Sequence, residues 1–569
     1  MFPFPFPTPE VPMDGLMMDV PLTLSHLFER AERYHHRKTI VTNTKDGLVT
    51  TTYGQWADRT RRLAAVFDQL GLTADARVGT FGWNSANHLA LYFAAPCSGR
   101  VCHTLNIRLF PEQLSYIVNH GSDEAIFVDR SLIPLLAPLV PTFTTVKHLV
   151  IMNDGDPAGA IAGAGGLSSS GFELSGPGAP ALHDLDTLLA GVEPLAVWPR
   201  LEENRAASMC YTSGTTGHPK GAVYSHRSTY LHTMALLQTD SIGVCERDVI
   251  MPVVPMFHVN AWGLAHGAVA SGATLVMPGP DLSAPTLADL MVSQRVTLAA
   301  GVPTIWMGVL PLLAGRDTSS LRTIPCGGSA VPKALSEGYR AVTGKPLLQA
   351  WGMTETSPIS AICHLASTFD GLSEDEAAER RTFVGRVVVG IDMRVVDPDT
   401  LEERPWDGDT SGELQVRGPW VIRTYHDDDR SPESFTADGW LKTGDVAVVD
   451  EFGYVKLVDR SKDVIKSGGE WISSVDVENE LMAHPKVAEA AVIGINHPRW
   501  QERPLACVVL KPGEQSTREE ILAFLEGRIA KWWMPDDVVF IDEVPKTSTG
   551  KFSKKDLRSR FLDHQLPTS

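Results

Sequence analysis

Residues 211–221 read YTSGTTGHPKG, a short run rich in glycines and hydroxyl side chains that ends in Pro-Lys-Gly. A Walker loop has the spacing G-x-x-x-x-G-K-[ST] and leads straight into a helix. Here Gly214 and Gly217 stand three apart, and Pro219 falls where the second Walker glycine belongs. The flanking runs ASMCY and GAVYSH favour strands, so we expect a loop between two strands.

A loop of this composition suits phosphate groups. The N–H groups of a glycine-rich turn can point at phosphate oxygens. The side chains that would add hydroxyl donors are Thr212, Ser213, Thr215 and Thr216. A polar surface turn is the alternative, but the ending Pro-Lys-Gly favours a phosphate cradle. The Walker spacing is missing, which disfavours a kinase or a GTPase.

The composition is that of a large globular protein with an acidic balance. A chain of 569 residues is too long for one core, and 43% hydrophobic with 21% charged residues argues against disorder. The net charge is −18 and no lysine- and arginine-rich run occurs, which excludes a nucleic-acid binder. An anionic ligand must therefore be met by local cations and N–H groups.

The cysteines and the apolar runs indicate in which cellular compartment the protein is expected. Seven cysteines without a CxxC pair indicate reduced thiols and a cytoplasmic protein. Eighteen dispersed histidines disfavour a hydrolytic metalloenzyme. The sequence has neither a signal-peptide pattern nor eighteen successive apolar residues, so we expect no transmembrane segment. The opening MFPFPFPTPEVP predicts an extended arm, and contact with a membrane or a neighbouring subunit stays open.

Helical and β-rich runs alternate along the chain, which is typical of an α/β parallel sheet. Residues 24–36 and 53–71 predict amphipathic helices, and residues 77–82, 124–129 and 148–152 predict strands. A Gly/Ala/Ser-rich stretch at 154–180 predicts a flexible surface loop. The pattern is more β-like after residue 383. From residue 460 a last unit predicts helices over 475–484 and 518–533 among strands.

Six further motifs accompany the loop: PMFHVNAWG (255–263), CGGSAV (326–331), QAWGMTETSP (349–358), WLKTGD (440–445), DRSKDVIKSGGEWIS (459–473) and PKTSTGK (545–551). With YTSGTTGHPKG they resemble, in order, the motifs of the adenylate-forming superfamily of acyl-CoA synthetases, luciferases and peptide-synthetase adenylation domains. Within it, PMFHVNAW and KSGGEWIS are most similar to medium- and long-chain fatty acyl-CoA synthetases and methylthiopropionate–CoA ligases.

The resemblance implies an α/β fold with two domains. A large N-terminal adenylation domain (1–459) would contain packed parallel sheets with helices and a β-rich subdomain. A hinge (460–462) would join it to a small, mobile α+β C-terminal domain (463–569). Related fatty acyl-CoA synthetases are often dimers through their large domains, so a homodimer is consistent with the resemblance.

The implied activity is that of an AMP-forming acid–CoA ligase. The carboxylate of a medium- or long-chain fatty acid would attack the α-phosphate of ATP, giving acyl-adenylate and pyrophosphate, and coenzyme A would then displace AMP. ATP, Mg²⁺ and coenzyme A are the cofactors implied. The alternatives are a ligase for methylthiopropionate or another short or aromatic acid, a fatty acyl-AMP ligase that feeds a carrier protein, and an inactive nucleotide-binding homologue.

The resemblance also assigns roles to single residues. Glu355 and Thr212 would bind Mg²⁺, Thr354 would meet the α-phosphate, and Lys551 would contact both the carboxylate and the α-phosphate. Asp445 would accept hydrogen bonds from the ribose hydroxyls. The implied nucleotide-binding positions are Thr212, Ser213, Gly214, Thr215, Thr216, Gly217, Lys220, Val259, Gly328, Ser329, Gln349, Ala350, Trp351, Gly352, Thr354, Asp445, Arg460, Lys462, Lys466, Trp471 and Lys551. Outside these motifs, Glu355 and Lys551 would be ordinary surface residues.

The acid and coenzyme A sites follow from the same resemblance. His258 would border the acyl carboxylate and act in catalysis with Lys551, Glu355 and Thr354, while Trp262 would gate the acyl tunnel. The two lie four apart, on one face if the segment is helical. Gly301, Gly328 and Gly352 would line the acid pocket, and small residues at 263–272 would leave room for a chain. Rotation about Lys462 would replace Lys551 with Gly468 and Gly469, which would line the pantetheine tunnel.

Overall fold

The structure is a computed structural model that describes residues 15–153, 179–212, 218–467, 470–547 and 551–567. Several predicted features lie outside the described residues. They are the Phe-Pro arm, most of the 154–180 loop, positions Ser213, Gly214, Thr215, Thr216 and Gly217 of the phosphate loop, and Gly468 and Gly469.

A seven-stranded sheet contains the phosphate loop. Its strands, in spatial order, are β7 (Ala181–Asp184), β6 (His148–Met152), β5 (Asp123–Asp129), β3 (Arg77–Phe81), β4 (Val101–Thr104), β8 (Ala206–Tyr211) and β9 (Gly221–Ser225). Neighbours pair in parallel except β8 and β9, which are antiparallel and flank the loop. The predicted strand–loop–strand unit is therefore confirmed, and no helix follows the loop directly.

A second, five-stranded sheet packs beside the first. Its order is β12 (Leu298–Ala300), β10 (Val249–Pro252), β11 (Thr274–Met277), β1 (Thr39–Thr44) and β2 (Gly47–Thr52). Helix α3 (Ala86–Cys97) contacts strands of both sheets, and all of its residues are buried. A helix that is apolar on every side belongs in such an interior position. The core of the large domain thus lies around α3 and its neighbours, α1 (Leu24–Tyr34) and α2 (Tyr53–Gln69).

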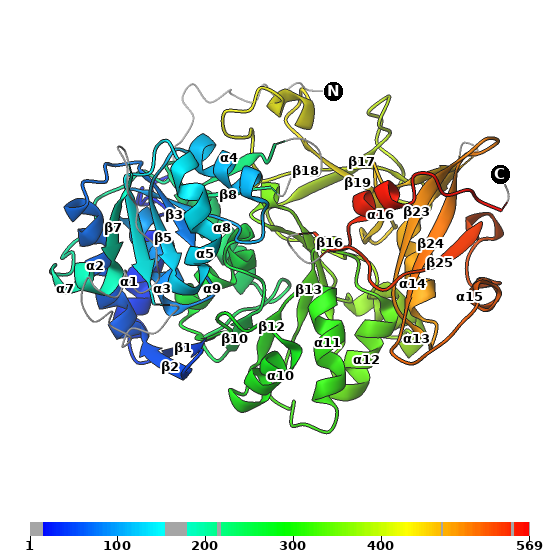
Figure 1. Cartoon of the computed structure of the whole chain (residues 1–569), viewed down its shortest axis with the longest axis horizontal. Coiled ribbons are helices and arrows are strands. Elements are labelled where there is room, and N and C mark those ends of the chain that lie inside the picture. The colour runs from blue at the N-terminus through cyan, green and yellow to red at the C-terminus, as the bar shows by residue number, and fades with distance from the viewer. Residues whose placement is uncertain (1–14, 154–178, 213–217, 468–469, 548–550, 568–569) are drawn as a thin grey trace, which may run out of the picture.

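Other helices cover the two sheets. They are α4 (Pro111–Gly121), α5 (Ile133–Leu136), α7 (Leu185–Ala190), α8 (His226–Leu237), α9 (Leu264–Ser271), α10 (Ala284–Ser293), α11 (Pro303–Leu313) and α12 (Lys333–Thr343). In Figure 1 the blue and cyan elements of the first sheet lie at the left, and the green helices α10, α11 and α12 lie at the bottom. Over the residues that the structure describes, no helix has the length and apolarity needed to cross a membrane.

Two smaller sheets complete the large domain. One contains β13 (Pro325–Gly327), β14 (Leu348–Gly352), β15 (Ile359–Ile362) and β16 (Arg386–Val387), and helix α13 (Glu374–Arg380) follows β15 in the chain. The other is fully antiparallel and contains β17 (Asp392–Val396), β18 (Gly412–Arg417), β19 (Leu441–Val449) and β20 (Val455–Arg460). These sheets confirm the predicted change to a β-rich subdomain.

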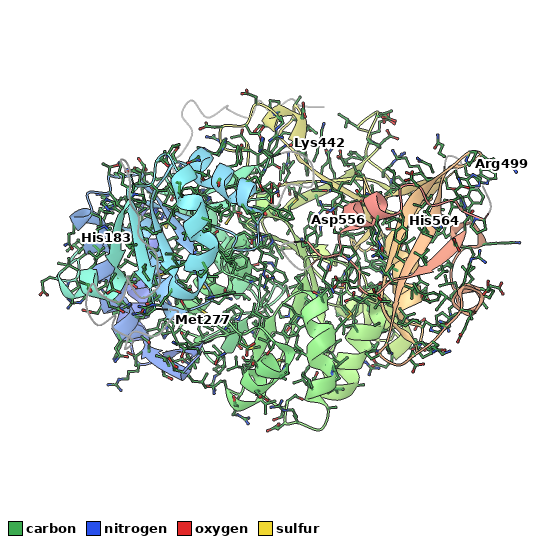
Figure 2. The ribbon with its side chains drawn as sticks, in the orientation of Figure 1. His183, Met277, Lys442, Arg499, Asp556 and His564 are labelled. Carbon is green, nitrogen blue, oxygen red and sulfur yellow. The ribbon has the colours of Figure 1, made fainter. Side chains whose placement is uncertain are left out.

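The C-terminal unit has its own sheet and core. Its strands are β21 (Ile465–Ser467), β22 (Glu470–Ile472), β23 (Val487–His497), β24 (Gln501–Leu510) and β25 (Asp537–Phe540), with helices α14 (Ser474–Met482), α15 (Arg518–Leu525) and α16 (Lys554–Arg560). The predicted helix over 518–533 is wrong in length: α15 ends at Leu525 because Gly527 adopts a φ of +75°. This unit forms the orange and red right-hand part of Figure 1. Figure 2 labels Arg499 and His564 in it, with His183 and Met277 on the large domain.

Strand β20 runs directly into the link between the two units. Arg460 still pairs with Asp445 across β19 and β20, and β21 of the small domain begins at Ile465. A buried polar cluster ties Asp459 to the small domain: the N–H of Ser474 donates to Asp459 Oδ2 at 3.2 Å, and Lys554 Nζ lies 2.8 Å from Glu478 Oε1. Buried charges require such pairing, so this cluster holds the two units in the observed arrangement.

Candidate active site

The ends of the phosphate loop are joined to each other by hydrogen bonds. The N–H of Thr212 donates to the carbonyl of Lys220 at 2.9 Å, and the N–H of Lys220 donates to Thr212 Oγ1 at 3.1 Å. The antiparallel pair β8–β9 thereby continues to the first and last described residues of the loop. These two hydrogen bonds fix Thr212 and Lys220 relative to each other.

The predicted Mg²⁺ ligand lies in a buried turn next to this loop. Glu355 is 7% exposed, and the hydroxyl of Tyr425 donates to its Oε1 at 2.7 Å. The hydroxyl of Tyr224 donates to the carbonyl of Thr354 at 2.6 Å. Within the described part of the chain, the other carboxylate oxygen, Oε2, accepts no hydrogen bond and Glu355 forms no ion pair. A buried carboxylate with one oxygen that accepts no hydrogen bond among the described residues fits a hard cation such as Mg²⁺.

A second cluster occupies the predicted ribose site. Trp351 Nε1 donates to Asp445 Oδ2 at 2.9 Å, and Arg460 Nε lies 2.7 Å from Asp445 Oδ1. Each carboxylate oxygen has a further lone pair, so Asp445 can still accept from two hydroxyls. The ion pair with Asp445 raises the pKa of Arg460. Trp351 therefore helps to fix the carboxylate by its indole N–H.

The motifs CGGSAV (326–331) and QAWGMTETSP (349–358), which contain predicted nucleotide-binding positions, have glycines where no side chain fits. A Cβ on Gly327 would lie 2.4 Å from the carbonyl oxygen of Ala350, and one on Gly352 would lie 1.9 Å from the carbonyl oxygen of Pro358. The side chain of Gln349 is bound within the protein, because its amide donates to the carbonyl of Thr382 at 2.9 Å. Ser329 follows directly after Gly328, which has a φ of +84°. Gly327 allows the backbones of β13 and β14 to approach closely, and Gly352 allows β14 to approach the backbone of Pro358 before β15.

Lys551 reaches this site from the small domain. A Cβ on Gly328 would lie 3.2 Å from Lys551 Cε and 3.7 Å from its Nζ, so the side chain lies directly against that glycine. Burial lowers the pKa of Lys551 to about 8, with a further lowering by Arg460, while Asp445 and Glu355 act in the opposite direction. The structure thus brings together four predicted residues, Lys551, Arg460, Asp445 and Glu355, in one charged cluster.

His258 and Trp262 do not lie on a helix of the usual hand, so the condition under which they would share one helical face is not met. His258 is extended, with φ −124° and ψ 116°, and the next four residues, 259–262, have φ between +44° and +56°. Such a left-handed run is costly for residues with a side chain. Asn260 supports it: its amide donates to Ser208 Oγ at 3.2 Å.

The left-handed turn still places both side chains by the cluster. Burial, together with the charges of Lys551 and Arg108, lowers the pKa of His258 to about 3, which keeps the imidazole neutral. The tip of the Trp262 ring, Cη2, would lie 3.6 Å from a Cβ on Gly327. The small residues after Trp262 do not leave open space as expected. A Cβ on Gly263 would lie 2.6 Å from His232, and one on Gly272 would lie 2.2 Å from His35.

Three predicted residues belong to the link and the first hairpin of the small domain. Lys462 lies in the connection after β20, and Lys466 pairs with Trp471 across β21 and β22. The N–H of Lys466 donates to Glu502 Oε2 at 2.9 Å. This hydrogen bond joins β21 to the start of β24 within the small domain.

Tyr425, Tyr224 and Ser434 contact the site but were not predicted. Tyr425 and Ser434 belong to the segment before β19, and Lys220 Nζ lies 3.3 Å from Ser434 Oγ. A tyrosine followed by three aspartates (YHDDD, 425–429) reads as a surface loop. The sequence offered no periodicity or charge pattern that could have identified its hydroxyl as a partner of Glu355.

Comparison with known proteins identifies the family. Residues 27–426 match the AMP-binding enzyme family, and residues 476–551 match the AMP-binding enzyme C-terminal domain. The chain therefore belongs to the AMP-binding enzyme family. In the solved structures, ATP-bound MatB from Rhodopseudomonas palustris has a TM-score of 0.79 at 27% identity, covering 96% of this chain and 99% of that chain.

Curated relatives extend over nearly the whole chain. A 3-methylmercaptopropionyl-CoA ligase from Ruegeria lacuscaerulensis is 45% identical, covering 97% of this chain and 99% of its own. A long-chain-fatty-acid–CoA ligase from Thermus thermophilus is 42% identical (96% and 97%), and a medium-chain-fatty-acid–CoA ligase from Ectopseudomonas oleovorans is 40% identical (98% and 99%). The predicted reaction class, an AMP-forming acid–CoA ligase that uses ATP, Mg²⁺ and coenzyme A, is confirmed.

The position of Glu355 predicts the effect of removing its carboxylate. Glu355→Ala should lower pyrophosphate release in the adenylation step by about 10²–10³-fold, because the carboxylate that would hold Mg²⁺ on the phosphates is lost. Thermal unfolding should stay cooperative. The exposed Glu514→Ala is the matched control and should retain the parent rate. Pyrophosphate release at the parent rate in Glu355→Ala would contradict the assignment.

The lowered pKa of Lys551 predicts a pH limit. The ammonium form carries the charge, so it is lost as the pH rises through about 8. The kcat/KM of adenylation for ATP reports groups of the free enzyme, and it should fall about tenfold per pH unit above this value. Lys551→Arg stays charged and should show a lower but flat profile to pH 10. A parent profile that is flat to pH 10 would show that this charge is not needed.

Proposed function

We propose that the charged cluster performs the adenylation step. The acid's carboxylate oxygen forms a bond to the α-phosphorus of ATP, and pyrophosphate leaves; the thiol sulfur of coenzyme A then bonds to the acyl carbon, and AMP leaves. The observation that carries the proposal is Lys551 against Gly328, in the same cluster as Arg460, Asp445 and Glu355. Two anions meet in the first step, so positive charge must be in place beforehand.

Each side chain has a part that its contacts support. Lys220 and the Thr212 hydroxyl lie at the ends of the phosphate loop. Asp445 is fixed in position and would accept hydrogen bonds from the ribose. Lys551 would place its ammonium near the carboxylate and the α-phosphate. Glu355 Oε2 and Thr212 would hold Mg²⁺, which supplies charge neutralisation on the phosphates when it is bound. Neutral His258 can border the carboxylate without adding a fixed charge.

For the acid, we propose an unbranched aliphatic chain of medium to long length. The described wall beside Lys551 is apolar. Trp262 lies by Gly327, Val302 Cγ1 would lie 3.4 Å from a Cβ on Gly328, and Trp306 covers Gly301. Each buried methylene contributes about 0.8 kcal/mol to the binding free energy, so an apolar pocket binds longer chains more tightly. The two fatty-acid relatives at 40–42% identity support this choice.

A second candidate is 3-methylmercaptopropionate. Ligases named for this acid from two Ruegeria species are 45% and 44% identical to the chain. The acid is an uncharged-tail thioether about as long as pentanoate, so the same apolar wall would accept it. The two candidates therefore differ in chain length rather than in the chemistry of the pocket.

A thioester assay with ATP and coenzyme A distinguishes them. The acids would run from acetate to palmitate, with 3-methylmercaptopropionate and benzoate included. The proposal expects the highest kcat/KM for unbranched acids of about six carbons or more. A peak at pentanoate and 3-methylmercaptopropionate would establish the second candidate, and a preference for benzoate would overturn both.

Trp262 is expected to limit the acyl chain. Trp262→Ala removes the ring beside Gly327 and should shift the preferred acid by two or more carbons, since each methylene in an apolar pocket changes selectivity about 10–200-fold. The KM for ATP should stay within about twofold. Trp406→Ala, at a half-exposed tryptophan between β17 and β18, is the control. Unchanged acid selectivity in Trp262→Ala would contradict the gate.

A further inference from the structure

The segment between β18 and β19 is bound both to the start of β9 and to the turn that carries Glu355. The N–H of His426 donates to the carbonyl of Gly221 at 2.8 Å, immediately after the loop. The N–H of Ile422 donates to the carbonyl of Glu355 at 2.9 Å. The segment is thus joined by main-chain hydrogen bonds to both the loop and the turn that carries the carboxylate, with Tyr425 between the two attachment points.

Tyr425 contacts two charged residues, one through its hydroxyl and one through its ring. Its hydroxyl donates to Glu355 Oε1 at 2.7 Å, and Lys220 Nζ lies 4.5 Å from the centre of its ring. The residue is only 7% exposed, and its N–H donates to Ser431 Oγ at 3.0 Å, which fixes the backbone. An ammonium over a ring is attracted by the π face, and a hydroxyl bonded to a carboxylate is a strong, directional contact.

We propose that Tyr425 is a positioning residue that sets metal and phosphate binding together, by holding Glu355 through its hydroxyl and Lys220 through its ring. This inference rests on the proposed function, in which Glu355 binds Mg²⁺ and Lys220 meets ATP phosphates. Oε1 accepts the hydrogen bond of the phenol, so Oε2, which accepts none among the described residues, is the oxygen better placed for the ion. Partners of this kind, one step behind a metal ligand, typically change metal affinity 10–100-fold when they are removed.

The two contacts can be separated by substitution. Tyr425→Phe keeps the ring under Lys220 and loses the hydrogen bond to Glu355. Tyr425→Leu loses both. The probe is Mn²⁺, whose binding is followed by electron paramagnetic resonance in the presence of a non-reacting α,β-methylene analogue of ATP. This readout measures binding and does not depend on turnover.

The two substitutions should differ in their effects on Mn²⁺ binding and on analogue binding. Tyr425→Phe should weaken Mn²⁺ binding at least tenfold, while binding of the analogue in EDTA stays within about twofold. Tyr425→Leu should weaken both. The matched control is Tyr53→Phe, which removes the hydroxyl of a fully buried tyrosine that donates to the carbonyl of Ala273 at 2.8 Å, and it should leave Mn²⁺ binding unchanged.

The Glu355→Ala variant distinguishes the two ways to fail. Parent Mn²⁺ affinity in Glu355→Ala would show that the proposed metal site is wrong. Weak Mn²⁺ binding in Glu355→Ala with parent affinity in Tyr425→Phe would overturn the role of Tyr425 alone. If Tyr425→Phe does not melt cooperatively, Tyr425→His, which keeps a ring and an N–H donor, replaces it. Its Mn²⁺ affinity should exceed that of Tyr425→Leu, and equal affinities would refute the proposal.

Discussion

The contact between Lys551 and Gly328 is the interaction on which the proposed chemistry depends. It brings a cation of the small domain against the backbone of the large domain, where a Cβ on Gly328 would lie 3.2 Å from Lys551 Cε and where the φ of +84° favours glycine. The protein has a net charge of −18, so most of its surface repels the two anions that it must join. Burial of this lysine beside Arg460 lowers its pKa to about 8, so the ammonium form is still present at neutral pH next to a second cation.

The surroundings of Lys551 show how the large domain prepares this position. Asp445 is held from both sides, by the indole of Trp351 and by Arg460, which is the last residue of β20. The next residues form the link to the small domain, and Asp459, one residue earlier, is bound within the buried cluster with Ser474. Arg460, which binds the Asp445 carboxylate, and Asp459, which contacts the small domain, are therefore adjacent residues of β20. A rotation of the small domain would affect both.

The sequence predicted the parts of the site that lie in short, chemically distinctive runs. The strand–loop–strand unit around Lys220, the β-rich subdomain and the grouping of Glu355, Asp445 and Lys551 all agree with the structure. The left-handed turn at 259–262 could not be predicted, because no residue there is a glycine and the turn depends on tertiary support from Ser208. The contact of Tyr425 could not be predicted either, because it also depends on tertiary structure: its partner Glu355 is 70 residues away in the chain.

Separate assays of the two half-reactions in Lys551→Ala would show whether Lys551 serves adenylation and not the transfer to coenzyme A. Pyrophosphate release from acid and ATP should fall by about 10²–10³-fold or more, because a preorganised charge is removed. Thioester formation from chemically supplied acyl-adenylate and coenzyme A should continue at close to the parent rate. Equal loss in both half-reactions would contradict the account and assign Lys551 a structural role or a role in binding coenzyme A.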